Sequence, residues 1–283
     1  SIRLFTLLAD LLPADMPSGG VSTSPLSYRY WWDGEKALTE ATEKATEHIL
    51  DVVEALVNLR VRTGKSMHLD IEPEPDGILE NSREFIAWYQ DVLVPAACRR
   101  WEDGEDRVRE HVQLCFDVCH FAVAYEEPKE VVAALAAAGI RTGKIQVSSA
   151  LQVDLQSDAA EKLSALKRFD EPVYLHQVVA RRLDGEFEAF RDLGAALEAY
   201  RPGVYAEWRV HYHVPLFTED YALLQSTQSE ILKTFEALEE TNFTDQLEIE
   251  TYTWGVLPEA LQAPLNASII REIAWVKRQL SSI

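Results

Sequence analysis

Apolar residues recur along this chain at helical spacing, and short apolar runs lie between the periodic segments. Residues 35–61 place an apolar side chain about every 3.6 positions, which is typical of an amphipathic helix that ends at Gly64. The same spacing predicts helices over 2–12, 82–99, 128–138, 158–168, 190–200, 219–240 and 258–280. Runs bounded by turn residues predict strands over 21–25, 67–72, 112–118, 144–148, 173–179, 210–215 and 247–254.

Strands and helices alternate along the whole chain, without a repeat or a low-complexity linker. This alternation favours a parallel sheet covered by helices. It predicts an α/β fold, a (β/α)8 TIM barrel formed as a single domain over residues 1–283, and a doubly wound open sheet is the alternative. The helical pattern is already under way at Ile2, so we expect the barrel to lack its first one or two βα units in this sequence. No glycine-rich nucleotide motif follows any strand.

Composition narrows the classes of function. The chain has 283 residues, 47% hydrophobic and 26% charged, which suits a globular enzyme. It has no apolar run long enough to cross a membrane. Its net charge of −20 argues against nucleic acid or anionic lipid as a partner. Three cysteines cannot build a disulfide framework, so a reducing, cytoplasmic location is expected. The sequence leaves the oligomeric state open.

Polar side chains gather at the carboxyl ends of the predicted strands, where barrel enzymes place their catalytic groups. They are Glu72, Asp117, His120, Gln146, His176, His211, His213 and Glu250. Each alone could be a solvated loop residue, a helix cap or a core histidine. Together they favour a shared divalent cation (Mn, Co, Mg or Zn), because carboxylate oxygen and imidazole nitrogen bind these ions. His211 and His213 are expected on one face of the strand at 210–215, since strand side chains alternate.

Other reactive side chains give weaker signals. Cys115 and Cys119 lie four residues apart, without the spacing of a structural zinc motif, and are expected to be buried packing residues. Arg181 and Arg182 could bind a phosphate or carboxylate, or could belong to a solvated hairpin.

The ordered set Glu72, Asp117-Val-Cys-His120, Gln146 and Glu250 resembles the xylose isomerase-like TIM-barrel superfamily of sugar-phosphate isomerases and epimerases. In its ketose 3-epimerase branch a Glu, an Asp-x-x-His, a His and a final Glu hold one divalent metal, and Gln146 stands here in place of the third ligand. His176 followed by Arg182 is similar to that branch's His and substrate-binding Arg. This resemblance implies a helix and hairpin inserted at about 152–190.

Longer strings resemble the metabolite traffic protein EboE family, within the same superfamily. They are Glu72-Pro-Glu-Pro-Asp76 with Glu80, Lys144-Ile-Gln-Val-Ser-Ser-Ala-Leu151, Tyr174-Leu-His-Gln177, His211-Tyr-His-Val-Pro-Leu-Phe217 and Glu250-Thr-Tyr-Thr-Trp254. The match spans residues 19–258. It implies a metal held by Glu72, Asp117, Gln146 and Glu250. The substrate pocket would be lined by Glu80, His176, Arg182, His211, His213 and Trp254.

These residues predict an isomerase or epimerase that acts on a small sugar or polyol, or its phosphate. Glu72 and Glu250 would remove and return a proton on two faces of the substrate, through a metal-stabilised enediolate. His120 would orient Asp117 or contact a substrate hydroxyl. One alternative is a barrel that binds or carries a metabolite without changing it. The other is a zinc-dependent phosphodiesterase similar to abasic-site endonucleases, with His120, His211 and His213 as ligands.

Overall fold

Residues 1–170, 174–253 and 262–282 are described by a computed structural model, and the chain divides into two compact units. The first unit contains Ser1–Asp117, Glu130–Ile145 and Phe243–Leu247. The second contains Val118–Lys129, Gln146–Asn242 and Glu248–Ile283.

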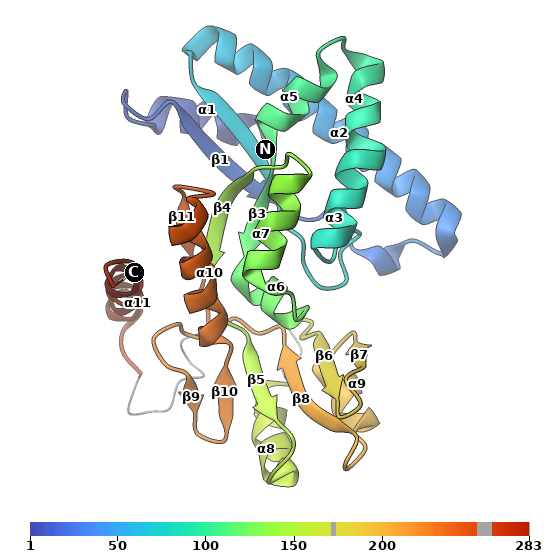
Figure 1. Ribbon diagram of the computed structural model, residues 1–283, viewed down its shortest axis with the longest axis vertical. Coiled ribbons are helices and arrows are strands. Elements are labelled where there is room, and N and C mark those ends of the chain that lie inside the picture. The colour runs from blue at the N-terminus through green and yellow to red at the C-terminus, as the bar shows by residue number, and fades with distance from the viewer. Residues whose placement is uncertain (171–173, 254–261, 283) are drawn as a thin grey trace. The chain divides into compact units, whose positions relative to one another are not determined.

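A curled sheet with parallel strands organises the first unit. Its strands are β1 (Ser18–Thr23), β2 (Ser66–Ile71), β3 (Val112–Asp117), β4 (Thr142–Val147) and β11 (Leu247–Ile249), in the order β1-β2-β3-β4-β11 (Figure 1). β2 pairs in parallel with both β1 and β3. Every residue of β3 and β4 is buried, as expected of parallel strands covered on both faces. The predicted α/β class is confirmed, with a half-barrel sheet.

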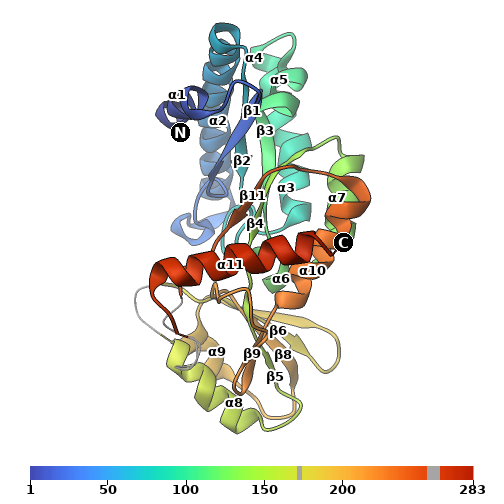
Figure 2. The ribbon, with the colours of Figure 1, turned by 90° about the vertical axis from the view of Figure 1, so that its left-hand side faces the viewer.

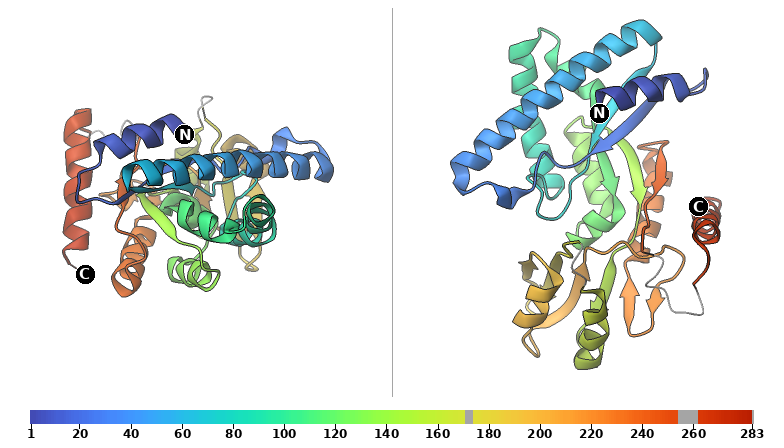
Figure 3. Two further views of the ribbon diagram at one scale, coloured as in Figure 1. Left: turned by 90° about the horizontal axis from the view of Figure 1, so that it is seen from above. Right: turned by 180° about the vertical axis from the view of Figure 1, so that it is seen from behind.

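Helices cover this sheet. They are α1 (Ile2–Leu11), α2 (Gly34–Thr63), α3 (Ser82–Trp88), α4 (Val94–Arg100), α5 (Gly104–His111) and α7 (Pro128–Ala137). α2 packs on β2 through its apolar stripe, and α1 lies against α2 and β1 (Figure 3). Gly64 ends α2 with a left-handed φ of 75°, which glycine adopts without steric cost. The predicted helix over 82–99 is α3 and α4 joined by a π-helical turn at Tyr89–Leu93.

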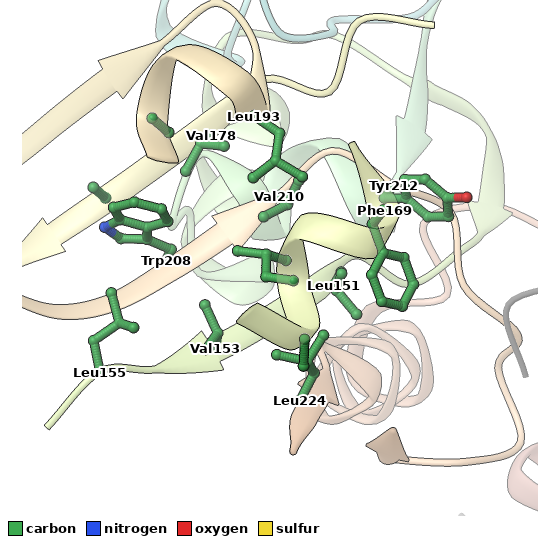
Figure 4. Close-up of a cluster of buried hydrophobic side chains, with 14 of the residues drawn as sticks. Leu151, Val153, Leu155, Phe169, Val178, Leu193, Trp208, Val210, Tyr212 and Leu224 are labelled. Carbon is green, nitrogen blue, oxygen red and sulfur yellow. The ribbon is translucent and has the colours of Figure 1, made fainter. Parts of the chain in front are cut away.

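An antiparallel sheet organises the second unit, so the prediction of parallel strands throughout is wrong here. Its strands are β5 (Leu151–Asp154), β6 (Val178–Arg182), β7 (Phe187–Phe190), β8 (Tyr205–Val210), β9 (Asp220–Tyr221) and β10 (Leu224–Ser226). Their order is β7-β6-β8-β5-β10-β9. Figure 4 shows the core beneath this sheet, where Leu151 and Val153 of β5 meet Trp208 and Val210 of β8.

The remaining helices of the second unit are α6 (Val118–Val123), α8 (Ala159–Leu166), α9 (Leu193–Ala199), α10 (Gln228–Thr241) and α11 (Leu265–Leu280). α11, the red helix of Figure 2, is held to this unit by Glu272, whose carboxylate accepts from the Leu216 N–H at 3.1 Å. The helix predicted over 258–280 is observed from Leu265 to Leu280, and residues 258–261 lie outside the described residues.

One predicted placement of candidate residues is wrong. The strand expected at 210–215 is β8 at Tyr205–Val210, so His211 and His213 follow the strand instead of alternating on it. Asp117 ends β3, as expected of the strand at 112–118, and His120 lies three residues further on, on α6. In β8, charged residues alternate with buried ones, and that period-two pattern marks the strand better than the apolar positions after it.

Within the described part of the chain, no helix combines the length and the apolar character that a membrane crossing requires. A single barrel domain over residues 1–283, with an insertion at about 152–190, stays a prediction. In that range the structure has α8 and a β6–β7 hairpin, and β6 continues the sheet through β8.

Candidate metal centre

Three imidazoles converge in the second unit. The Nε2 atom of His120 lies 3.0 Å from Nε2 of His211 and 3.4 Å from Nε2 of His213. Two nitrogen ligands of one tetrahedral zinc ion are about 3.3 Å apart, given Zn–N bonds of about 2.0–2.1 Å. Each of these two distances is therefore compatible with a pair of nitrogen ligands on one cation, and the three residues are here called the three-histidine group.

Backbone hydrogen bonds hold the segment that carries His211 and His213. The His211 N–H donates to the Gln177 carbonyl at 2.8 Å, and the Val214 N–H donates to the Ser149 carbonyl at 2.9 Å. The Thr253 hydroxyl donates to the His213 carbonyl. The backbone that carries both imidazoles is thus anchored at Gln177 and Ser149.

The outer nitrogens of both imidazoles contact oxygen acceptors. Nδ1 of His211 lies 2.9 Å from the Gln177 side-chain oxygen, and Nδ1 of His213 lies 3.2 Å from the Glu250 carbonyl. Since these oxygens only accept, each Nδ1 carries a hydrogen. Metal-bound histidines make this kind of outer hydrogen bond in proteins.

The electrostatics favour the neutral form that binds metals. Burial lowers the pKa of His211 well below its usual value, and the neighbouring imidazoles of His120, His213 and His176 lower it further. Nε2 of His120 contacts both of the other rings and can supply at most one hydrogen to them. A cation bound by these nitrogens would take the place of that hydrogen.

A thiol belongs to the same region. Sγ of Cys119 and one ring nitrogen each of His211 and His213 all lie within 4.8 Å of one another. Cys119 is fully buried on α6, and its backbone N–H donates to the Ser148 hydroxyl at 2.8 Å. The second unit therefore contains histidine and cysteine groups that could hold a metal ion.

The other predicted site residues of the second unit lie on separate elements. The Gln146 amide donates to the Glu250 carboxylate. His176 precedes β6, and its Nδ1 donates to the His211 carbonyl at 3.1 Å. Arg182 ends β6 and pairs with Asp184 at 3.0 Å, across the hairpin turn. Trp254 lies outside the described residues.

In the first unit, Glu72 directly follows β2 and Asp117 ends β3. A carboxylate oxygen of Glu72 lies within 4.8 Å of one of Asp117. Glu80 accepts from the Asp76 N–H at 3.3 Å and lies 3.7 Å from Arg29, and burial raises its pKa. The proposed ligands Glu72 and Asp117 thus belong to the first unit and Gln146 and Glu250 to the second, and the four-ligand set stays a prediction.

The first unit holds a different buried histidine. Nδ1 of His68 lies 2.6 Å from Oδ1 of Asp70, and its Nε2 lies 3.3 Å from the Gln246 amide nitrogen. A Cβ on Gly20 or Gly143 would lie within 2.0 Å of the Asp70 carboxylate, so both positions require glycine. Burial raises the pKa of Asp70, and the hydrogen bond from His68 opposes this rise.

Sequence reasoning missed several of these participants. It assigned Cys119 to packing, and it gave no role to Gln177, His68 or Asp70. The adjacency of Cys119 to His120, beside a His-x-His pair later in the chain, is the signal that could have identified the thiol. The hydrogen-bond partners arise from tertiary contacts and leave no spacing to recognise.

A scan against protein-family models finds no match to this chain, and a search among curated proteins finds none either.

Proposed function

We propose that this protein is a divalent-metal-dependent enzyme that isomerises or epimerises a small sugar or polyol, with the (β/α)8 barrel of the xylose isomerase-like superfamily as its fold. The observation that carries the metal part of the proposal is the convergence of three Nε2 atoms at 3.0 and 3.4 Å. The residue pattern of Glu72, Asp117-x-x-His120, Gln146 and Glu250 supports the reaction class.

The three-histidine group would hold the metal, and the neutral state of His211 suits that role. When bound, the ion would polarise a substrate carbonyl and stabilise the negative charge that forms beside it. The outer hydrogen bonds of His211 and His213 keep both rings oriented.

Glu250 is the proposed proton-transfer residue of this unit. Its carboxylate accepts a hydrogen bond from the Gln146 amide, which fixes its orientation and leaves it able to accept a proton. The backbone carbonyl of Glu250 accepts a hydrogen bond from His213, so the proposed base also contacts a proposed metal ligand. Glu250 would remove a proton from the carbon next to the carbonyl and, as its conjugate acid, return a proton to complete the isomerisation.

Hydrolysis of a small phosphodiester is the second candidate. The three-histidine group favours it, because histidine-rich zinc centres activate water. The net charge of −20 makes a nucleic acid an unfavourable substrate for such a centre.

Proton exchange distinguishes these functions. The zinc-, cobalt- or manganese-loaded protein is incubated in D2O with a panel of ketoses, aldoses and their phosphates, and deuterium next to the carbonyl is followed by NMR. We expect exchange with at least one ketose, and a Glu250→Gln variant that binds metal but exchanges at least about 100-fold more slowly. A loaded protein that exchanges no compound, yet cleaves a chromogenic phosphodiester, overturns the isomerase proposal in favour of hydrolysis.

A further inference from the structure

Cys119 lies directly before His120 on α6, and its whole side chain is buried. It packs against Val123 and Ala150 on one side. Its sulfur also lies within 4.8 Å of ring nitrogens of both His211 and His213. Packing explains the apolar contacts of this residue, but the sulfur and the two ring nitrogens beside it also form a donor set that zinc binds.

We infer that Cys119 is a thiolate ligand of the centre formed with His211 and His213, and that this centre takes zinc or a similar borderline cation in preference to magnesium or manganese. This inference rests on the proposed metal-dependent function. It goes beyond that function by naming a further ligand and the class of metal.

The chemical type of the donor atoms determines which metal the site prefers. Nitrogen and sulfur ligands select zinc, cobalt and related ions, whereas magnesium and manganese prefer oxygen. A single thiolate beside neutral imidazoles would also partly neutralise a dication in a buried setting. On binding, the thiol proton leaves to solvent, so loading should release about one proton for each thiolate formed.

The surroundings of Cys119 differ from those of the other buried thiol. Burial raises the pKa of Cys115 well above its usual value, and the carboxylates of Glu72 and Asp117 raise it further. No such group of imidazoles accompanies Cys115 among the described metal-binding groups. Cys115 is therefore a matched control, a buried cysteine four residues earlier in the chain.

Cobalt substitution tests the inference without any substrate. Co²⁺ is titrated into the metal-free full chain, and its visible ligand-field bands and near-ultraviolet sulfur-to-cobalt charge-transfer band are recorded. We expect both in the wild type. Cys119→Ser should lose the charge-transfer band, keep the ligand-field bands and bind zinc about 10- to 100-fold more weakly. Cys115→Ser should keep both bands.

The outcomes separate the inference from the proposed function. Ligand-field bands without a charge-transfer band in the wild type overturn the role of Cys119 and leave the metal centre standing. No cobalt or zinc binding at all overturns both. If Cys119→Ser fails to fold, zinc-edge X-ray absorption of the wild type decides, because a sulfur ligand gives a shell at about 2.3 Å and nitrogen ligands alone do not.

Discussion

Each unit of the molecule buries histidines, and they are satisfied in different ways. In the first unit, both nitrogens of His68 have a protein partner, Asp70 on one side and Gln246 on the other. In the second unit, the outer nitrogens of His211 and His213 contact oxygens, while their inner nitrogens face His120. Both arrangements are buried and polar, so burial and composition alone do not separate them.

The two arrangements differ in the groups that the ring nitrogens contact. Around His68, both ring nitrogens face side-chain groups of the protein, as is normal for a buried polar residue, although the second oxygen of Asp70 has no hydrogen-bond partner among the described residues. In the three-histidine group, ring nitrogens contact one another, and such nitrogens are also ligands that zinc binds. We therefore interpret the first group as structural and the second as a ligand site.

Removing a ligand of the three-histidine group should have the largest effect. His211→Ala should weaken zinc binding by on the order of 3 kcal/mol, because four ligands share a binding free energy of about 10–16 kcal/mol. Titration against a competing chelator measures this loss. His48→Ala, an exposed histidine on α2, is the control and should bind zinc like the wild type. Equal affinities for the two variants would make the three-histidine group a structural cluster.

Removing His68, the histidine of the first unit that contacts Asp70, should change the stability of the fold instead of metal binding. His68→Ala leaves the buried Asp70 oxygen and the Gln246 amide without their partner, so the free energy of unfolding should fall by about 2 kcal/mol. Urea denaturation measures this change, and Asp70→Asn, which keeps an acceptor for His68, should lose less. Zinc loss in His68→Ala would remove the contrast between the two groups.

The outer hydrogen bonds should contribute less than the ligands. Gln177→Leu removes the acceptor of the His211 Nδ1 hydrogen, and zinc affinity should fall about tenfold, since outer partners typically contribute 10- to 100-fold. The same titration measures it, with the exposed Gln225→Leu as control. An unchanged affinity would show that the orientation of His211 does not depend on Gln177.

The smallest expected effect is a dependence of stability on pH that comes from His111 in the first unit. Burial lowers the pKa of His111, whose Nδ1 donates to the Met67 carbonyl at 2.7 Å. The unfolded chain then binds more protons than the folded chain below about pH 6.5, so stability should decrease as pH falls through that value, by at most about 1.4 kcal/mol per pH unit. His111→Asn should reduce this slope in urea denaturation between about pH 5.5 and 7.5. An identical slope would assign the pH dependence to other groups.

The sequence predicted the local elements of the first unit well, because their signals are local. The apolar period of α2 and the apolar run of β2 both lie where the spacing placed them. The second unit was harder. In β8 the buried positions alternate with charged residues, and its partners β5 and β6 are distant in the chain, so antiparallel pairing left no local signal.

The same reasoning applies to the candidate site. His120, His211 and His213 were identified from their residue types, although the strand expected to carry His211 and His213 ends before them. What the residue types could not reveal is the direction of each ring. That direction depends on Gln177 and on the Glu250 carbonyl, which come from other parts of the chain. The role of Cys119 became visible only through its distance from His211 and His213.

The most direct test of the central claim is the metal content of the purified full chain, measured by elemental mass spectrometry after zinc loading and dialysis. We expect about one zinc ion per chain in the wild type. We expect loss of that ion in a variant that replaces His120, His211 and His213 with alanine, and retention in His68→Ala. A wild-type chain that retains no metal, or a triple variant that retains as much as the wild type, would contradict the central claim.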